Sequence, residues 1–270
     1  MQIGIVTLFP QMVRAALDVG VCGRALNRGI ATVSTTDPRD HATDVHRTVD
    51  DRPFGGGPGM VLKYEPLARA IAAARSNVPE GGRTIFLSPQ GRRFDQAIAN
   101  ELSRLPGFVL VAGRYEGFDE RLHEALADEE LSVGDFVLSG GEVAALAVVD
   151  AVLRLLPGAL GDETSAAQDS FGDGLLDCPH YTRPEVVAGR MVPAVLVGGD
   201  HAAIARWRRK QALGRTWLRR PDLLAGRDWK QGEKALLEEY LAEHNLTDNG
   251  GRNFDGTGCA HEREPGPILK

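Results

Sequence analysis

The stretch VLVAGRYEG, residues 109–117, joins a short run of branched apolar residues to a loop that contains two glycines. Similar apolar runs cover residues 2–8, 31–34 and 84–87, and such runs are typical of strands buried on both faces. Between the strands, apolar residues recur with helical spacing, over residues 10–18, 65–74 and 95–103. The alternation predicts an α/β domain with a mostly parallel sheet.

Beyond these runs the chain changes character. Residues 142–156, EVAALAVVDAVLRLL, predict a helix buried on most sides and ended by Pro157 and Gly158. The polar, acidic stretch 161–177 predicts a mobile connector. We therefore expect a first domain over residues 1–160.

A smaller helical domain is expected over residues 178–246. Asp200 could cap a helix over 201–213 that ends at Gly214, and residues 230–244 form a second amphipathic pattern. The last stretch, 247–270, is rich in glycine, proline and charge, and we expect it to be disordered.

Composition narrows the class of protein. The 270 residues are 43% hydrophobic and 25% charged, which excludes collagen-like, coiled-coil and wholly disordered chains. No apolar run approaches the ~20 residues of a membrane span, and the N-terminus lacks an export signal, so a cytoplasmic protein is expected. The net charge of −6 argues against indiscriminate coating of nucleic acid but leaves room for a local basic patch.

Several familiar catalytic motifs are absent from the sequence. It has no GxGxxG after the first strand, no GxxxxGK[ST] and no GxSxG, which disfavours a Rossmann dinucleotide site, a P-loop and an α/β-hydrolase. Three widely spaced cysteines and seven scattered histidines fit neither a disulfide framework nor a zinc site. We therefore expect no catalytic zinc.

Three glycine-bearing loops each follow an expected strand: LSPQG at 87–91, AGRYEG at 112–117 and SVGDFVLSGGE at 132–142. In a parallel sheet such loops meet at the carboxyl ends of the strands, where glycines let the backbone approach a flat ligand. With Glu116 and apolar walls, the pocket would suit an adenine and ribose better than a polyphosphate. Any one loop could equally be a tight turn.

Two further features have both a functional and an ordinary explanation. RPFGGGPGM, residues 52–60, is either a flexible turn or a surface on which backbone lies against a base or phosphate. Arg154, near the end of an apolar helix, either pairs with Asp150 one turn earlier or directs its charge into the pocket.

The segment 201–221 carries seven basic residues, no acidic residue and two tryptophans. This predicts either an electrostatic surface for a nucleic-acid backbone or a solvated helix face. The basic residues are Arg206, Arg208, Arg209, Lys210, Arg215, Arg219 and Arg220.

Taken together, FGGGPGM, LSPQG, GRYEGFDER, SVGDFVLSGGE, RLLPG, DSFGDGLLDCPHYTRP and RWRRKQALGRT resemble, in this order, the bacterial tRNA (guanine-N1-)-methyltransferases of the knotted SPOUT superfamily. The resemblance runs from residue 1 to about residue 246. It implies an N-terminal domain with a deep trefoil knot that binds S-adenosylmethionine, and a C-terminal helical domain that grips tRNA. It also implies a homodimer whose active site crosses the subunit interface.

The resemblance assigns the cofactor site to the three loops. The implied cofactor residues are Leu87, Ser88, Pro89, Gly113, Tyr115, Glu116, Val133, Gly134, Asp135, Phe136, Val137, Leu138, Gly140 and Gly141. Phe86 and Phe136 stand where family members often carry tyrosine.

The chemistry implied is methylation of guanine at N1, which carries a proton and attacks poorly until that proton is removed. The resemblance implies that Asp169 is the general base and that Arg154 stabilises the negative charge that develops on O6. Gly59, Ser165, His180, Arg208 and Arg209 are expected to contact tRNA.

The substrate implied is the guanine at tRNA position 37, preceded by another guanine that the 52–60 loop would read. The family's reported need for Mg²⁺ has no ligand cluster in the sequence to match it. Two rivals stay open: a non-catalytic RNA-binding protein on the same fold, and a related enzyme that methylates another position. Arg154 and Asp169 favour an enzyme, and the DSFGDGLLDCPHYTRP segment favours guanine N1.

Overall fold

The computed structural model describes residues 1–161 and 169–246, and the chain divides into two compact units, Met1–Ala166 and Ala167–Lys270. The expected tail at 247–270 and residues 162–168 of the expected connector lie outside the described residues. In the described ranges, no helix is long and apolar enough to cross a membrane.

The first unit is built on a five-stranded parallel sheet, which confirms the predicted α/β domain with a mostly parallel sheet. Its strand order is β2-β1-β6-β5-β7. The strands are β1 (Gln2–Val6), β2 (Thr32–Thr36), β5 (Arg83–Arg93), β6 (Gly107–Ala112) and β7 (Glu129–Ser132). Every residue of the central strand β6 is buried, as expected for a run of apolar residues without alternation.

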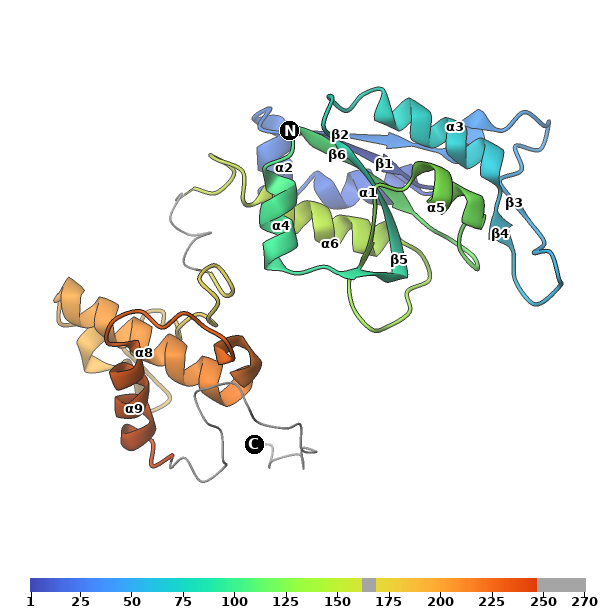
Figure 1. The fold of residues 1–270 in the computed structure, drawn as a ribbon. Coiled ribbons are helices and arrows are strands. Elements are labelled where there is room, and N and C mark those ends of the chain that lie inside the picture. The colour runs from blue at the N-terminus through green and yellow to red at the C-terminus, as the bar shows by residue number, and fades with distance from the viewer. Residues whose placement is uncertain (162–168, 247–270) are drawn as a thin grey trace. The chain divides into compact units, whose positions relative to one another are not determined.

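Helices cover both faces of this sheet (Figure 1). One apolar cluster joins the strands to α1 (Pro10–Leu17), α2 (Gly20–Asn27), α4 (Gln96–Ser103) and α6 (Glu142–Leu153). The other joins the opposite face to α3 (Tyr64–Arg75) and α5 (Glu120–Leu126). Alternate residues of the strands therefore enter different clusters; Leu110 of β6 faces α6, whereas Val109 and Val111 face α3.

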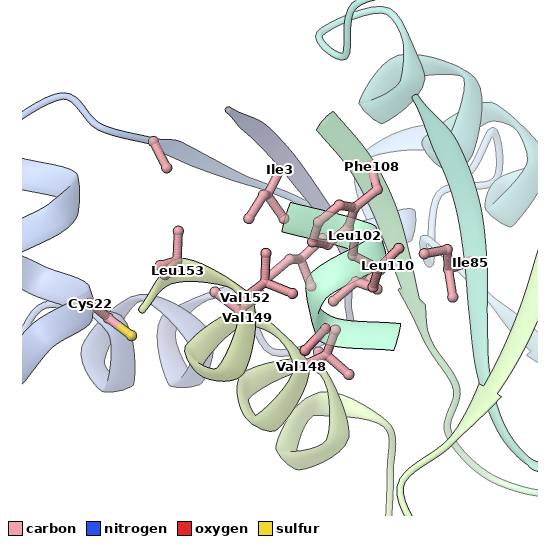
Figure 2. Close-up of a cluster of buried hydrophobic side chains, with 14 of the residues drawn as sticks. Ile3, Cys22, Ile85, Leu102, Phe108, Leu110, Val148, Val149, Val152 and Leu153 are labelled. Atoms are coloured by element: carbon pink, nitrogen blue, oxygen red, sulfur yellow. The ribbon is translucent and has the colours of Figure 1, made fainter. Parts of the chain in front are cut away.

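The helix α6 lies against the sheet with most of its surface covered, as its sequence predicts. Figure 2 shows Val148, Val149, Val152 and Leu153 directed toward strand residues and toward Cys22 of α2. Its final residues differ from the prediction: the helix ends at Leu153, because Leu155 and Leu156 donate to carbonyls three residues back rather than four.

Short elements complete the first unit. They are the 3₁₀ turn η1 (Pro38–His41) and an antiparallel pair, β3 (Asp50–Asp51) with β4 (Val61–Leu62). The 52–60 loop joins the two strands of this pair, so it is a hairpin connection.

The second unit has its own core, in which Leu213, Leu237 and Tyr240 are buried together with Leu175. Its elements are β8 (Val186–Val187), β9 (Arg190–Met191), η2 (Ala194–Leu196), α8 (His201–Arg219), η3 (Pro221–Leu224) and α9 (Glu233–Glu243). Asp200 caps α8 as predicted, since its side chain accepts from the backbone N–H groups of Ala202 and Ala203.

Gly214 does not end α8, and this prediction was wrong. The helix continues to Arg219, and Gly214 lies where α9 packs most closely, with the Tyr240 ring 2.2–2.3 Å from the position that a Cβ would occupy. The glycine allows α8 and α9 to pack closely and does not end the helix.

Gly214→Ala should therefore destabilise the second unit by about 1–3 kcal/mol, the usual cost of overpacking a core. Chemical denaturation of the full chain measures this loss. Gly198→Ala is the matched control, because a Cβ there meets nothing closer than 3.7 Å. Equal stability of the Gly214→Ala and Gly198→Ala variants would contradict the close contact.

Candidate active site

A cavity of about 440 Å³ opens in the first unit where three loops meet. Its volume falls within the ~300–1,000 Å³ of small-molecule sites. Thirteen of the fourteen predicted cofactor residues line it: Leu87, Ser88, Pro89, Gly113, Tyr115, Glu116, Val133, Gly134, Phe136, Val137, Leu138, Gly140 and Gly141. Asp135, the fourteenth, is not among the lining residues.

The sheet explains why these loops meet. β5, β6 and β7 are neighbours and run parallel, so the segments at their carboxyl ends share one edge. The predicted loop at 87–91 is an irregularity inside β5, whose pairing with β7 shifts register between Leu87 and Arg92. Gly91 permits this, since a Cβ there would lie 2.4 Å from the backbone nitrogen of Leu131.

Backbone contacts hold the second and third loops together. The N–H of Gly141 donates to the carbonyl of Gly113 over 2.8 Å. A Cβ on Gly141 would lie 2.8 Å from the Cα of Ala112, so only glycine allows this approach. The glycine of SGGE that precedes α6 is thus required by packing beside the cavity.

Glu116 connects the cavity to the 52–60 loop. Its backbone N–H donates to the carbonyl of Met60 over 2.9 Å. Gly59 has φ +84° and lies against the Glu116 carboxylate, which would be 2.2 Å from an added Cβ. The structure therefore brings the predicted substrate residue Gly59 to the acidic side chain that lines the cavity.

Sequence analysis missed part of the wall. Phe118 and His123 line the cavity, and the His123 ring lies 4.6 Å from the ring of Phe86 and 5.4 Å from that of Phe118, centroid to centroid. His123 comes from α5, outside the three loops. The signal was available in the GRYEGFDER motif, which runs past the glycine loop into this helix.

The two predicted catalytic residues belong to different units. Arg154 is the half-buried residue that follows the last residue of α6, and its backbone N–H donates to the carbonyl of Asp150. The Asp150 carboxylate accepts from the Cys22 thiol over 3.1 Å. Asp169 is half-buried at the start of a turn in the second unit, where its carbonyl accepts from the N–H of Gly172.

The segment 169–177, expected to be part of the connector, packs on the helical core of the second unit. Leu175 is buried there, and the N–H of Leu176 donates to the Thr216 hydroxyl of α8 over 2.9 Å. Arg227 donates to the Asp173 carbonyl over 2.6 Å. These contacts give the turn that carries Asp169 a fixed place in its own unit.

Arg208 and Arg209, predicted together as tRNA contacts, have different surroundings. Arg208 is exposed on α8. Arg209 donates from Nε to the buried Glu233 carboxylate over 2.9 Å and also pairs with Asp173. Hydrogen bonds from Arg209 and Arg227 outweigh burial and lower the pKa of Glu233.

His180 lies beside Asp177 and Cys178, and the three could offer ligand atoms within 4.8 Å of one another. His180 Nε2 is 2.7 Å from the Asp177 carboxylate. Burial alone would raise the pKa of Asp177, but the hydrogen bonds from His180 and from the N–H of Cys178 lower it. Burial and the neighbouring Asp177 raise the pKa of the Cys178 thiol. The last predicted residue, Ser165, lies outside the described residues.

Known proteins match almost the whole chain. The family model described as "tRNA (Guanine-1)-methyltransferase TrmD" matches residues 1–226. A "tRNA (guanine-N(1)-)-methyltransferase" of Methylococcus capsulatus is 60% identical over 251 residues, which are 93% of this chain and 100% of the relative. Proteins of the same name from Halorhodospira halophila and Chromohalobacter salexigens are 57% and 56% identical, over 95% and 93% of this chain and 97% of each relative.

Proposed function

Because the chain belongs to the tRNA (guanine-1)-methyltransferase family, we propose that it transfers a methyl group from S-adenosylmethionine to N1 of the guanine at tRNA position 37. The observation that carries this proposal is the cavity at the β5, β6 and β7 ends, lined by the loops whose motifs match the family. The agreement of cavity and motif supports a donor site at this edge of the sheet.

The cavity fits the proposed donor. Close packing at Gly140 and Gly141 leaves backbone, rather than side chains, along one wall, where a flat purine can lie close to the chain. Leu87, Phe136 and Leu138 supply apolar surface, and Glu116 supplies hydrogen-bond acceptors for ribose hydroxyls or the amine of the donor. When bound, S-adenosylmethionine supplies an electrophilic methyl group on its sulfonium.

The chain's own residues would prepare the guanine. We assign to the Asp169 carboxylate the removal of the N1 proton, which frees the nitrogen lone pair for attack. We assign to Arg154 the stabilisation of the negative charge that develops on O6 as that proton leaves. Both residues would also fix the base in line with the methyl group.

Arg154 and Asp169 belong to separate units, and we propose that a homodimer completes the site, with one subunit holding the donor and its partner supplying Asp169. Exposed apolar side chains of the first unit support association: Val137 is 87% exposed, Val143 is 50% exposed, and Phe9 and Met12 are also exposed. A second copy of the chain would remove such surface from water.

We further propose that the chain of the first unit forms a deep trefoil knot. Threading is rare among proteins, so this part of the proposal depends on family membership. The close backbone contacts at Gly91 and Gly141 are consistent with segments that pass tightly beside one another.

We propose that the 52–60 loop, through Gly59, contacts the base that precedes the target guanine. We propose that His180, Ser165 and Arg208 contact other parts of the tRNA. Gly59 beside Glu116 places that loop next to the cavity. Arg209, predicted with Arg208, is engaged by Glu233 and Asp173, so we assign it to holding segment 169–177.

Arg208→Gln should reduce by about one the slope of log affinity for tRNA against log salt, because one phosphate contact is lost. Filter binding over a series of salt concentrations measures the slope. Arg83→Gln is the control, since Arg83 lies at the amino end of β5, opposite the loops at the carboxyl ends, and pairs with Glu101. A slope equal to that of the unchanged protein would make Arg208 part of a solvated helix face.

The described side chains do not form a site that suits Mg²⁺. Mg²⁺ prefers oxygen ligands, whereas the one group of at least three close ligands in the described ranges combines a carboxylate with a thiol and an imidazole.

The test is to incubate the protein with labelled S-adenosylmethionine and unmodified tRNA that has guanines at positions 36 and 37, and to map the methylated nucleoside. We expect 1-methylguanosine at position 37, and no label in tRNA with adenine at 37. Label on a ribose or on another base would support the rival modification enzyme. Binding of tRNA without methyl transfer would support the non-catalytic RNA-binding protein.

A further inference from the structure

Glu142, in the first turn of α6, is a fully buried carboxylate that does not line the cavity. A buried charge is costly unless partners satisfy it. Each of its oxygens has one: Oε1 accepts from the Thr7 hydroxyl over 2.9 Å, and Oε2 accepts from Arg114 Nε over 2.8 Å. The carboxylate thus joins the end of β1 to the loop after β6.

Arg114 extends this connection to the cavity wall, which it lines. Its Nη1 donates to the carbonyl of Ser139 over 3.1 Å, and its guanidinium lies 4.4 Å from the centre of the Phe9 ring. A Cβ on Gly140 would lie 2.1 Å from Arg114 Nε, so the Ser139–Gly140 backbone rests directly on this side chain.

Thr7 orients the carboxylate from the other side. The Thr7 hydroxyl accepts from the N–H of Phe9 over 2.9 Å, which leaves its proton to donate to Glu142. Thr7 is 1% exposed, so water does not substitute for either partner. Three segments distant in sequence therefore meet at one buried ion pair beneath the cavity.

We propose that Glu142 and Thr7 are positioning residues for the methyl donor: through Arg114 they hold the 112–117 and 132–142 loops at the separation that the donor requires. This inference depends on the proposed function, because it assumes that the cavity holds S-adenosylmethionine. Neither residue touches the cavity, so both act through Arg114.

Removing the Glu142 charge should free Arg114, which is already 20% exposed, to turn toward water. The Ser139–Gly141 backbone would then lose the side chain on which it rests, and the two loops would no longer be held in register. The donor would bind more weakly, whereas tRNA binding in the absence of donor should be unchanged.

The experiment compares Glu142→Gln, Thr7→Val and Thr7→Ser in the full-length protein. Calorimetry gives the Kd for S-adenosylmethionine, filter binding gives the Kd for tRNA, and thermal unfolding gives Tm. The control is Glu129→Gln: Glu129 is likewise a carboxylate held in ion pairs, with Arg83 and Arg92, and none of the three lines the cavity.

We expect Glu142→Gln and Thr7→Val to raise the donor Kd by at least ~10-fold, a difference of about 1.4 kcal/mol, with tRNA affinity kept. Thr7→Ser, which keeps the hydroxyl, should restore the donor Kd to within about 3-fold of the unchanged protein. Glu129→Gln should leave it unaltered.

A lower Tm with an unchanged donor Kd would overturn the inference and make the ion pair purely structural. If Glu142→Gln does not fold, Thr7→Val and Thr7→Ser decide the question by themselves. Failure of the unchanged protein to bind the donor would overturn the proposed function. Normal donor binding by that protein, by Glu142→Gln and by Thr7→Val would overturn only the positioning role.

Discussion

Replacing Asp169 with asparagine is expected to lower the single-turnover rate of methyl transfer by about 10²-fold or more, the scale of a general-base contribution. The amide has nearly the shape of the carboxylate but cannot take the N1 proton. The turn that carries residue 169 is fastened by Thr216 and Arg227 rather than by the Asp169 carboxylate alone, so the fold should survive. Rapid-quench assays with excess enzyme measure the rate.

Asp200→Asn is the matched control for this prediction. It makes the same chemical change in the same unit, at a helix cap where asparagine serves as well as aspartate. Its rate of methyl transfer should stay within about 2-fold of that of the unchanged protein, since a change at a helix cap affects stability and not the chemical step. An Asp169→Asn variant as fast as this control would remove Asp169 from the role of base.

Gly141→Ala should weaken donor binding by about 10²-fold, which corresponds to ~3 kcal/mol. The new methyl group would lie 2.8–2.9 Å from the backbone of Ala112 and Gly113, which cannot rotate away as a side chain can. The second and third loops would have to separate, and the cavity between them would change shape. Titration with S-adenosylmethionine measures the loss.

The control for the cavity is Gly161→Ala. Gly161 has no positive φ, and no atom of the described residues lies within 4 Å of an added Cβ. Its donor affinity should equal that of the unchanged protein. Equal affinities for Gly141→Ala and Gly161→Ala would show that the close approach of the loops has no part in binding the donor.

The sheet could be predicted from the sequence because each of its central strands contains a run of apolar residues, and β6 is the clearest case. The edge strand β7 has no such pattern: Glu129 and Glu130 open it, and the ion pairs of Glu129 with Arg83 and Arg92 are tertiary contacts. Gly214 is another case in which a tertiary contact could not be predicted. A glycine after a helical pattern is typical of a helix end, and the sequence does not reveal that Gly214 packs against Tyr240 of α9.

The cavity could be predicted from its glycines, since parallel strands bring their carboxyl ends to one edge. The ion pair between Glu142 and Arg114, which supports the cavity wall, could not be predicted from the sequence. Nothing in the sequence connects Glu142 with Thr7 or Arg114; the fold alone places the Glu142 carboxylate between the Thr7 hydroxyl and the Arg114 side chain. The roles of Arg154 and Asp169 come from family likeness and stay predictions, because they lie in units described separately.

We propose that the methyl donor occupies the cavity among the β5, β6 and β7 loops. A crystal structure of the full chain with S-adenosylmethionine at saturating concentration tests it most directly. We predict electron density for the adenosine part against Leu87, Gly113 and Leu138, with Glu116 in contact with the donor. Ordered donor bound elsewhere, or an empty cavity in a crystal whose protein binds the donor in solution, would contradict the account.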